Sequence, residues 1–193
     1  MKVSMKDCLQ LCAVFLQFEN VLALLSDDGG VNLSDEDKTE AERELNMLLR
    51  CANLVIHEIA SEYVHLKTYE SFNTTDGHIR YSDFLKQPVD IYSVKKEGNF
   101  CRFKLYPSEL ITQEGDVEVY YTYLPDKVET TGNLDFEEGK VNGRIIAYGT
   151  AAEYCVICGL YEEAVIWDKR YKDSLFNSVK SIKSVTLPER KWY

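Results

Sequence analysis

The feature that most constrains the fold is a change of hydrophobic period along the 193-residue chain. Apolar residues recur at helical spacing up to about residue 63, alternate with polar residues between 64 and 142, and return to helical spacing from about residue 144. A helix gathers residues three and four apart on one face, whereas a strand gathers every second residue on one face. A segment with one of these patterns therefore does not form an amphipathic element of the other type. The chain therefore predicts an α+β fold in which a β segment is inserted into a helical unit.

The N-terminal third predicts a hairpin of two helices. A capping pattern at Ser4 precedes a broad apolar face, which predicts a first helix over residues 4–25, ended by two glycines at 29 and 30. Ser34 is a favourable N-cap with acidic residues behind it, so a second helix is predicted over residues 35–63. The expected packing seam of that helix consists of Ala41, Leu45, Leu48, Ala52, Val55 and Ile59.

The middle segment predicts antiparallel strands. Alternation is clearest over residues 117–123 and is typical of a half-buried strand. Glycine-containing turns at Gly98 and Gly115 separate the strands. Shorter alternating pairs are Ile79 with Tyr81, Val89 with Ile91, and Phe103 with Leu105. We expect a small antiparallel sheet or partly closed barrel, followed by a polar return loop over residues 129–143.

Two further helices are predicted after residue 143. The first is apolar around much of its circumference, which predicts the most buried element, and Gly159 ends it. The second places Ala164, Trp167, Tyr171, Leu175 and Ser178 on one face. We expect one four-helix bundle from residues 1–63 and 143–180, a β insertion over 64–142, and an extended C-terminal segment over 181–193.

Charge is unevenly distributed in this acidic chain, whose net charge is -10. That balance disfavours a protein that grips the nucleic-acid backbone, which requires clustered Lys and Arg. Residues 26–44 hold eight acids, whereas residues 169–193 hold seven bases. The acids considered for an acidic surface are Asp27, Asp28, Asp35, Glu36 and Asp37.

Residues with catalytic or metal-binding chemistry are few and poorly spaced. Six cysteines without a recognisable secretory signal predict free, buried thiols in a reducing compartment. Cys155 and Cys158 have redox or zinc spacing but fall inside a helical pattern, which favours core packing. A zinc site would need two more ligands, for which Cys8 and Cys12 are the candidates, although their spacing is a loose match. The three histidines form no known catalytic spacing. We expect no enzyme activity, no metal and no cofactor.

The C-terminal segment combines a proline, two bases and two terminal aromatic rings. Such a peptide suits docking in a groove of another protein, where the rings anchor it and the charges position it. The alternative is that Trp192 folds back onto the chain's own helices. The candidate docking residues are Leu187, Pro188, Arg190, Lys191, Trp192 and Tyr193.

Three stretches carry a family resemblance. The run AYGTAAEYCVICGLYEEAVIWDKRYKDSL at residues 147–175, followed by the terminal RKWY, resembles the head-to-tail connector or adaptor proteins of tailed bacteriophages, including the tail tubular protein A group of short-tailed phages. GDVEVYYTYLP and DGHIRYS are also similar to that family. The resemblance covers about two thirds of the chain, from about residue 63 onward; the N-terminal hairpin is not matched.

The resemblance implies a structural role in the virion. Such connectors form rings, commonly dodecamers, that lie under the portal protein, join it to tail or nozzle proteins, and line the channel for DNA. It implies that residues 187–193 dock on the portal, that the negative surface lets DNA pass without specific binding, and that assembly occurs in the host bacterial cytoplasm, without a membrane. Two alternatives remain: a cytosolic protein-binding or regulatory module, and a metal- or thiol-dependent enzyme.

Overall fold

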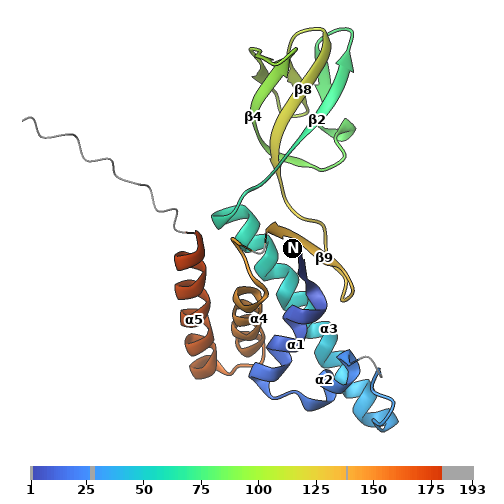
Figure 1. Cartoon of the computed structure of the whole chain (residues 1–193), viewed down its shortest axis with the longest axis vertical. Coiled ribbons are helices and arrows are strands. Elements are labelled where there is room, and N and C mark those ends of the chain that lie inside the picture. The colour runs from blue at the N-terminus through green and yellow to red at the C-terminus, as the bar shows by residue number, and fades with distance from the viewer. Residues whose placement is uncertain (1, 27–28, 138, 180–193) are drawn as a thin grey trace, which may run out of the picture.

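The computed structural model describes residues 2–26, 29–137 and 139–179, and it shows a mixed α+β fold with a helical body and a β unit that projects from one end of it (Figure 1). The predicted α+β class is confirmed. Five α-helices form the helical body in the described part of the chain. They are α1 (Met5–Leu16), α2 (Glu19–Leu25), α3 (Asp35–Glu58), α4 (Gly143–Ile157) and α5 (Tyr161–Val179).

Helix α4 is the centre of the helical body. It packs against α1, α3 and α5, and residues 145–152 are buried without interruption. The sequence prediction that this helix is the most buried one is therefore confirmed over residues 145–152. Gly149 allows the closest approach, because a Cβ atom there would lie 2.7 Å from Val55 Cγ1 of α3 and 3.1 Å from the ring of Tyr171 on α5.

The prediction of one helix over residues 4–25 is wrong, because the chain breaks between α1 and α2. Gln17 adopts a left-handed conformation with φ 59°, and its backbone N–H caps the end of α1 by donating to the carbonyl oxygens of Ala13 and Val14. The new direction lets α2 pack along α3. Phe15, Leu16 and Phe18 all pack against the core, so the apolar pattern continues through the break. The pattern therefore does not indicate where α1 ends.

Helix α3 follows its prediction closely. The Ser34 hydroxyl accepts a hydrogen bond from the backbone N–H of Asp37 at 3.2 Å, as expected of an N-cap. The predicted seam is buried from Ala41 to Ile59, except for the half-buried Leu45. After Glu58 the helix widens into one π turn, η1 (Ile59–Tyr63), before the chain enters the β unit.

The strands form three antiparallel sheets, and none of the sheets in the described residues closes into a barrel. The partly closed barrel considered from the sequence is therefore not formed. The four-stranded sheet has the order β2 (Leu66–Thr74), β8 (Gly115–Tyr123), β4 (Pro88–Lys96), β5 (Asn99–Phe100). The three-stranded sheet has the order β3 (His78–Arg80), β7 (Glu109–Ile111), β6 (Lys104–Leu105), and β1 (Lys2–Ser4) pairs with β9 (Asn133–Glu137). A short 3₁₀ turn, η2 (Tyr81–Asp83), follows β3.

The β unit has a hydrophobic core separate from that of the helical body. Val117, Val119 and Tyr121 project from β8 into this core, where Ile79 and Leu110 meet them from the three-stranded sheet. Strand β2 pairs with β8 over its whole length, from Leu66 opposite Tyr123 to Thr74 opposite Gly115. The alternation recognised in residues 117–123 is thus the central strand of the β unit.

The predicted polar return loop over residues 129–143 contains a strand. In β9, Leu134 and Phe136 are buried in the core of the helical body, and the strand pairs with β1 near the N-terminus. The last residues of the predicted β insertion therefore pack with the helices. Strand β9 has only two inward-facing apolar residues, and Gly, Asp and Glu surround them in the sequence. The alternation is therefore too short to predict a strand.

Candidate assembly surfaces

Three of the five predicted acidic residues lie at the start of α3. Asp35, Glu36 and Asp37 are all exposed in its first turn, where the positive end of the helix dipole favours carboxylates. The Asp37 carboxylate also accepts a hydrogen bond from the Ser34 hydroxyl at 2.6 Å. Asp27 and Asp28 lie outside the described residues. The described acids form a negative end of the helical body, distant from the β unit (Figure 1).

The six predicted docking residues, Leu187, Pro188, Arg190, Lys191, Trp192 and Tyr193, also lie outside the described residues. The described chain ends at Val179, on the rim of a groove of about 580 Å³ at the junction of the helical body and the β unit. Tyr63, Leu66, Tyr123 and Asp135 contribute to its lining.

Helix α5 leaves one side uncovered. Tyr161 and Val165 are each 69% exposed and Phe176 is 63% exposed, while Ala164, Tyr171 and Leu175 of the same helix are buried. We call Tyr161, Glu162, Val165, Lys169 and Phe176 the α5 face. Next to it, Val156, Ile157, Leu160 and Ile166 add exposed aliphatic side chains around the turn from α4 to α5. Contiguous apolar exposure of this kind marks interaction surfaces more often than isolated exposed residues do.

A stack of aromatic rings fixes which side of α5 faces outward. Phe15 of α1 stacks on Tyr148 of α4 at 5.0 Å and on Trp167 of α5 at 5.2 Å between ring centroids. The Arg170 guanidinium lies 4.9 Å from the Trp167 ring and covers its outer part. Because Trp167 is held inward, the α5 face is held outward.

Helix α3 has a smaller uncovered side. Leu54 is 58% and Met47 is 36% exposed, and Arg50 lies between them on the same side of the helix. We call Met47, Arg50 and Leu54 the α3 face. Helix α4 packs against α5, α3 and α1, and α5 lies at the edge of the helical body (Figure 1). The helical body thus carries two different uncovered faces.

The cysteines are interior residues with two exceptions. Cys8, Cys12, Cys51 and Cys155 are buried, and burial raises the pKa of the Cys51 thiol to about 11 and that of Cys8 to about 12. Cys155 packs in the core as predicted, but Cys158 is exposed because α4 ends at Ile157, so core packing is wrong for it. No group of three or more His, Cys, Asp or Glu side chains that could hold a metal ion occurs among the described residues.

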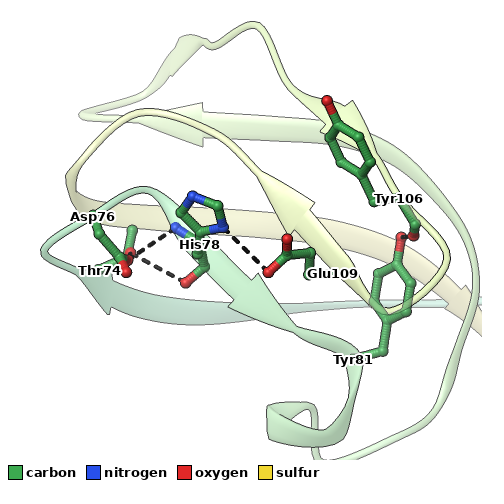
Figure 2. Close-up of polar contacts among 6 residues, drawn as sticks. All are labelled: Thr74, Asp76, His78, Tyr81, Tyr106 and Glu109. Carbon is green, nitrogen blue, oxygen red and sulfur yellow. Dashed lines mark hydrogen bonds and ion pairs between the residues drawn. The ribbon is translucent and has the colours of Figure 1, made fainter.

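His78 at the start of β3 belongs to a surface network of polar groups (Figure 2). The Asp76 carboxylate accepts hydrogen bonds from the His78 backbone N–H and from the Thr74 hydroxyl, both at 3.1 Å. The His78 ring lies 3.1 Å from the Glu109 carboxylate across the β3–β7 pair. These contacts fix the turn between β2 and β3, so we interpret them as structural.

An aromatic row crosses the outer side of the four-stranded sheet. Tyr69 of β2 stacks on Tyr120 of β8 at 5.3 Å, and the Lys95 ammonium of β4 lies 4.5 Å from the Tyr120 ring. Lys95 also lies 5.3 Å from the ring of Phe100 on β5. The sequence reasoning did not single out this row, although residues two apart on one strand share a face and Tyr120 could have indicated it.

The comparisons with known proteins identify no relative. No family model matches the chain, and no curated protein matches it. In addition, no helix in the described ranges combines the length and the apolar character needed to cross a bilayer. The function is therefore argued from the surfaces described above.

Proposed function

We propose that this protein is a head-to-tail connector, a non-enzymatic structural protein that forms a ring below the portal of a tailed bacteriophage, joins the capsid to the tail and lines the channel for DNA. The observation that carries the proposal is the pair of different uncovered faces on the helical body, the α5 face and the α3 face. Contact between unlike faces is a heterologous contact, which repeats from copy to copy and closes into a ring when the rotation permits.

The composition of the surfaces supports the same proposal. The α5 face exposes more than two thirds of the side chains of Tyr161 and Val165, as expected of a protein that is buried in an assembly. In this proposal α1, α3, α4 and α5 act as the four-helix bundle of each copy. The acids at the start of α3 line or border the DNA channel, where negative charge repels phosphate and keeps DNA from sticking.

The C-terminal segment supplies the contact with the portal. Residues 187–193 combine aromatic anchors with basic charge, and they follow α5, whose last residue, Val179, lines the junction groove. In this proposal tail or nozzle proteins bind on the opposite side of the ring.

Electron microscopy of the virion neck tests the location. We expect a ring of this protein between portal and tail, and a neck without density for it would overturn the proposal. A chain that lacks residues 187–193 tests the docking contact in a binding assay with the portal protein encoded in the same genome. It should fold with unchanged helicity and lose binding, whereas undiminished binding would place the portal contact elsewhere.

A protein-binding or regulatory module is the second candidate, and the aromatic row on the β unit favours it. Tyr69 is 57% and Phe100 is 80% exposed, and exposed Tyr and Phe side chains are frequent anchors in transient interfaces. This candidate predicts one copy of the chain per partner. The number of copies bound to a portal ring, measured by native mass spectrometry, therefore separates the two functions.

A further inference from the structure

Two stretches of chain join the β unit to the helical body, and each is anchored on the helical side (Figure 1). On the way out, the Val64 backbone N–H donates to the carbonyl oxygen of Ile59 in η1 at 2.8 Å. On the way back, the Asn53 side-chain amide of α3 donates to the Val128 carbonyl oxygen at 3.1 Å and accepts from the Val128 N–H at 2.8 Å. Residue 65 and residues 124–127 link these anchors to the β unit, and we call them the two links.

Apolar contact between the two parts is limited. Leu66, the first residue of β2, belongs to the core of the helical body and pairs with Tyr123 at the end of β8. Among the described residues, Tyr123 is the one side chain that packs on both cores. Two cores that share a single ring do not by themselves fix the angle between two structural units, because units without a large apolar interface move relative to each other.

A polar cluster lies at the same junction. Lys86, in the loop before β4, places its ammonium 3.6 Å from the Asp135 carboxylate of β9 and 3.0 Å from that of Asp126 in the second link. The ammonium also lies 5.1 Å from the centroid of the Tyr123 ring, and the Tyr123 hydroxyl donates a hydrogen bond to Asp135 at 3.3 Å. We call Lys86, Tyr123, Asp126 and Asp135 the junction cluster. Its members come from the β unit, the second link and the helical body.

The loop that carries Lys86 is itself fixed to the sheet of the β unit. The Glu70 carboxylate of β2 accepts hydrogen bonds from the Leu85 backbone N–H at 3.0 and 3.2 Å, and it also accepts one from the Tyr121 hydroxyl of β8. The Lys86 and Asp135 side chains are each about one third exposed, so salt screens their attraction less than that of a fully exposed pair. Lys86 therefore moves with the sheet, whereas Asp135 is held by β9 in the helical body.

We propose that the junction cluster holds the β unit at a set angle on the helical body, and that breaking the Lys86–Asp135 contact lets the β unit pivot about the two links. The junction groove has walls from both parts, with Lys67 on the β unit and Phe136 and Val179 on the helical body. A pivot therefore changes the width of the groove beside the last described residue of α5. The inference goes beyond the proposed connector function and does not depend on it.

Residual dipolar couplings of the backbone amides test the proposal, because they report the orientation of both parts in one frame. In the wild type, a single alignment tensor should fit the helical body and the β unit. Lys86→Ala should lower the alignment of the β unit by about twofold relative to that of the helical body, because a unit that samples several angles averages its couplings. Lys86→Arg keeps the charge and should retain the single tensor. Lys104→Ala, at an exposed site on β6, is the control.

Two carboxylate variants make the test specific. Asp135→Asn and Asp126→Asn remove the same charge from the same ammonium, but only Asp135 belongs to the helical body. Asp135→Asn should release the β unit as Lys86→Ala does, and Asp126→Asn, at a side chain 85% exposed in the link, should release it less. A single tensor in both Lys86→Ala and Asp135→Asn, or two tensors in the wild type, would overturn the proposal. Couplings that no longer fit within the β unit alone would also overturn it, because they would assign Lys86 to the fold of the sheet.

Discussion

The α5 face and the aromatic row of the β unit both expose large side chains, but lysine side chains lie over the rings of the aromatic row. On the β unit, Tyr120 and Phe100 share the Lys95 ammonium, and Lys67 lies 5.2 Å from the ring of Tyr92. On α5, Tyr161 and Val165 have no such partner among the described side chains. A lysine that lies over an aromatic ring stabilises the sheet through a contact within the same chain. An exposed aliphatic side chain is removed from water only when another molecule packs on it. This contrast is the reason that the proposed assembly runs through α5 and not through the aromatic row.

The largest expected effect tests whether the two hydrophobic cores are independent. Ile146 in α4 and Leu110 in β7 are both fully buried, in different clusters. Ile146→Ala and Leu110→Ala should each cost about 2–5 kcal/mol of the free energy of unfolding of their own region. Hydrogen exchange by region is the measurement. Ile146→Ala should deprotect the helices first, and equal loss in both regions would show that they unfold as one unit.

A smaller effect is expected where three helices approach most closely. Gly149→Ala places a methyl group 2.7 Å from Val55 Cγ1, and the stiff β-branched side chain of Val55 cannot easily turn away. The strain of about 1–3 kcal/mol should exceed the gain of about 1 kcal/mol in helix propensity. Thermal unfolding should show a lower midpoint for Gly149→Ala. Gly139→Ala, where no atom lies within 4 Å of the added methyl, is the control.

The bracing role of Lys95 predicts an effect smaller still. Lys95→Ala removes both cation–π contacts and should lower the stability of the β unit by about 0.5–1 kcal/mol, without affecting assembly. Chemical denaturation followed by tyrosine fluorescence measures the first effect, and native mass spectrometry measures the second. If Lys95→Ala instead prevented assembly, the aromatic row would be part of an interface and the contrast between the two regions would fail.

The smallest effect concerns pH. Burial, and then the neighbouring Glu62, raise the pKa of the Glu58 carboxyl on α3. A raised carboxyl pKa means that the charged form destabilises the folded state above that pKa and that the cost disappears as the pH falls through it. Glu58→Gln should therefore stabilise the protein at pH 7 by no more than a few tenths of a kcal/mol, since the group is partly solvated. The free energy of unfolding of Glu58→Gln and of the wild type should be measured at pH 7 and at pH 4. The variant should be no more stable than the wild type at pH 4, and a stabilisation that persisted at pH 4 would contradict the electrostatic cause.

The parts of the fold that the sequence could predict are those with a strong period. The seam of α3, the burial of α4 and the central strand β8 all follow from regular spacing of apolar residues. Strand β2 was missed because Lys67, Tyr69 and Glu70 hide its alternation, and the break at Gln17 was missed because it depends on one backbone conformation. Tertiary packing determines both the strand β2 and the break at Gln17, and neither feature can be predicted from the local spacing of apolar residues.

The candidate surfaces were predicted less well than the fold. The acids of α3 could be found from the charge run, but a helical wheel alone does not tell an uncovered apolar face from a buried one. Val165 and Tyr161 became recognisable only when the Phe15–Trp167 stack showed which side of α5 faces inward. The predicted docking residues beyond 186 remain a prediction.

Single-particle cryo-electron microscopy of the wild-type chain bound to its portal ring tests the central claim most directly. The account predicts a closed ring in which neighbouring copies contact one another through their helical bodies and cover Val165 of the α5 face. Copies that touch only the portal, or a ring whose contacts run through the β units while Val165 stays exposed to solvent, would contradict it.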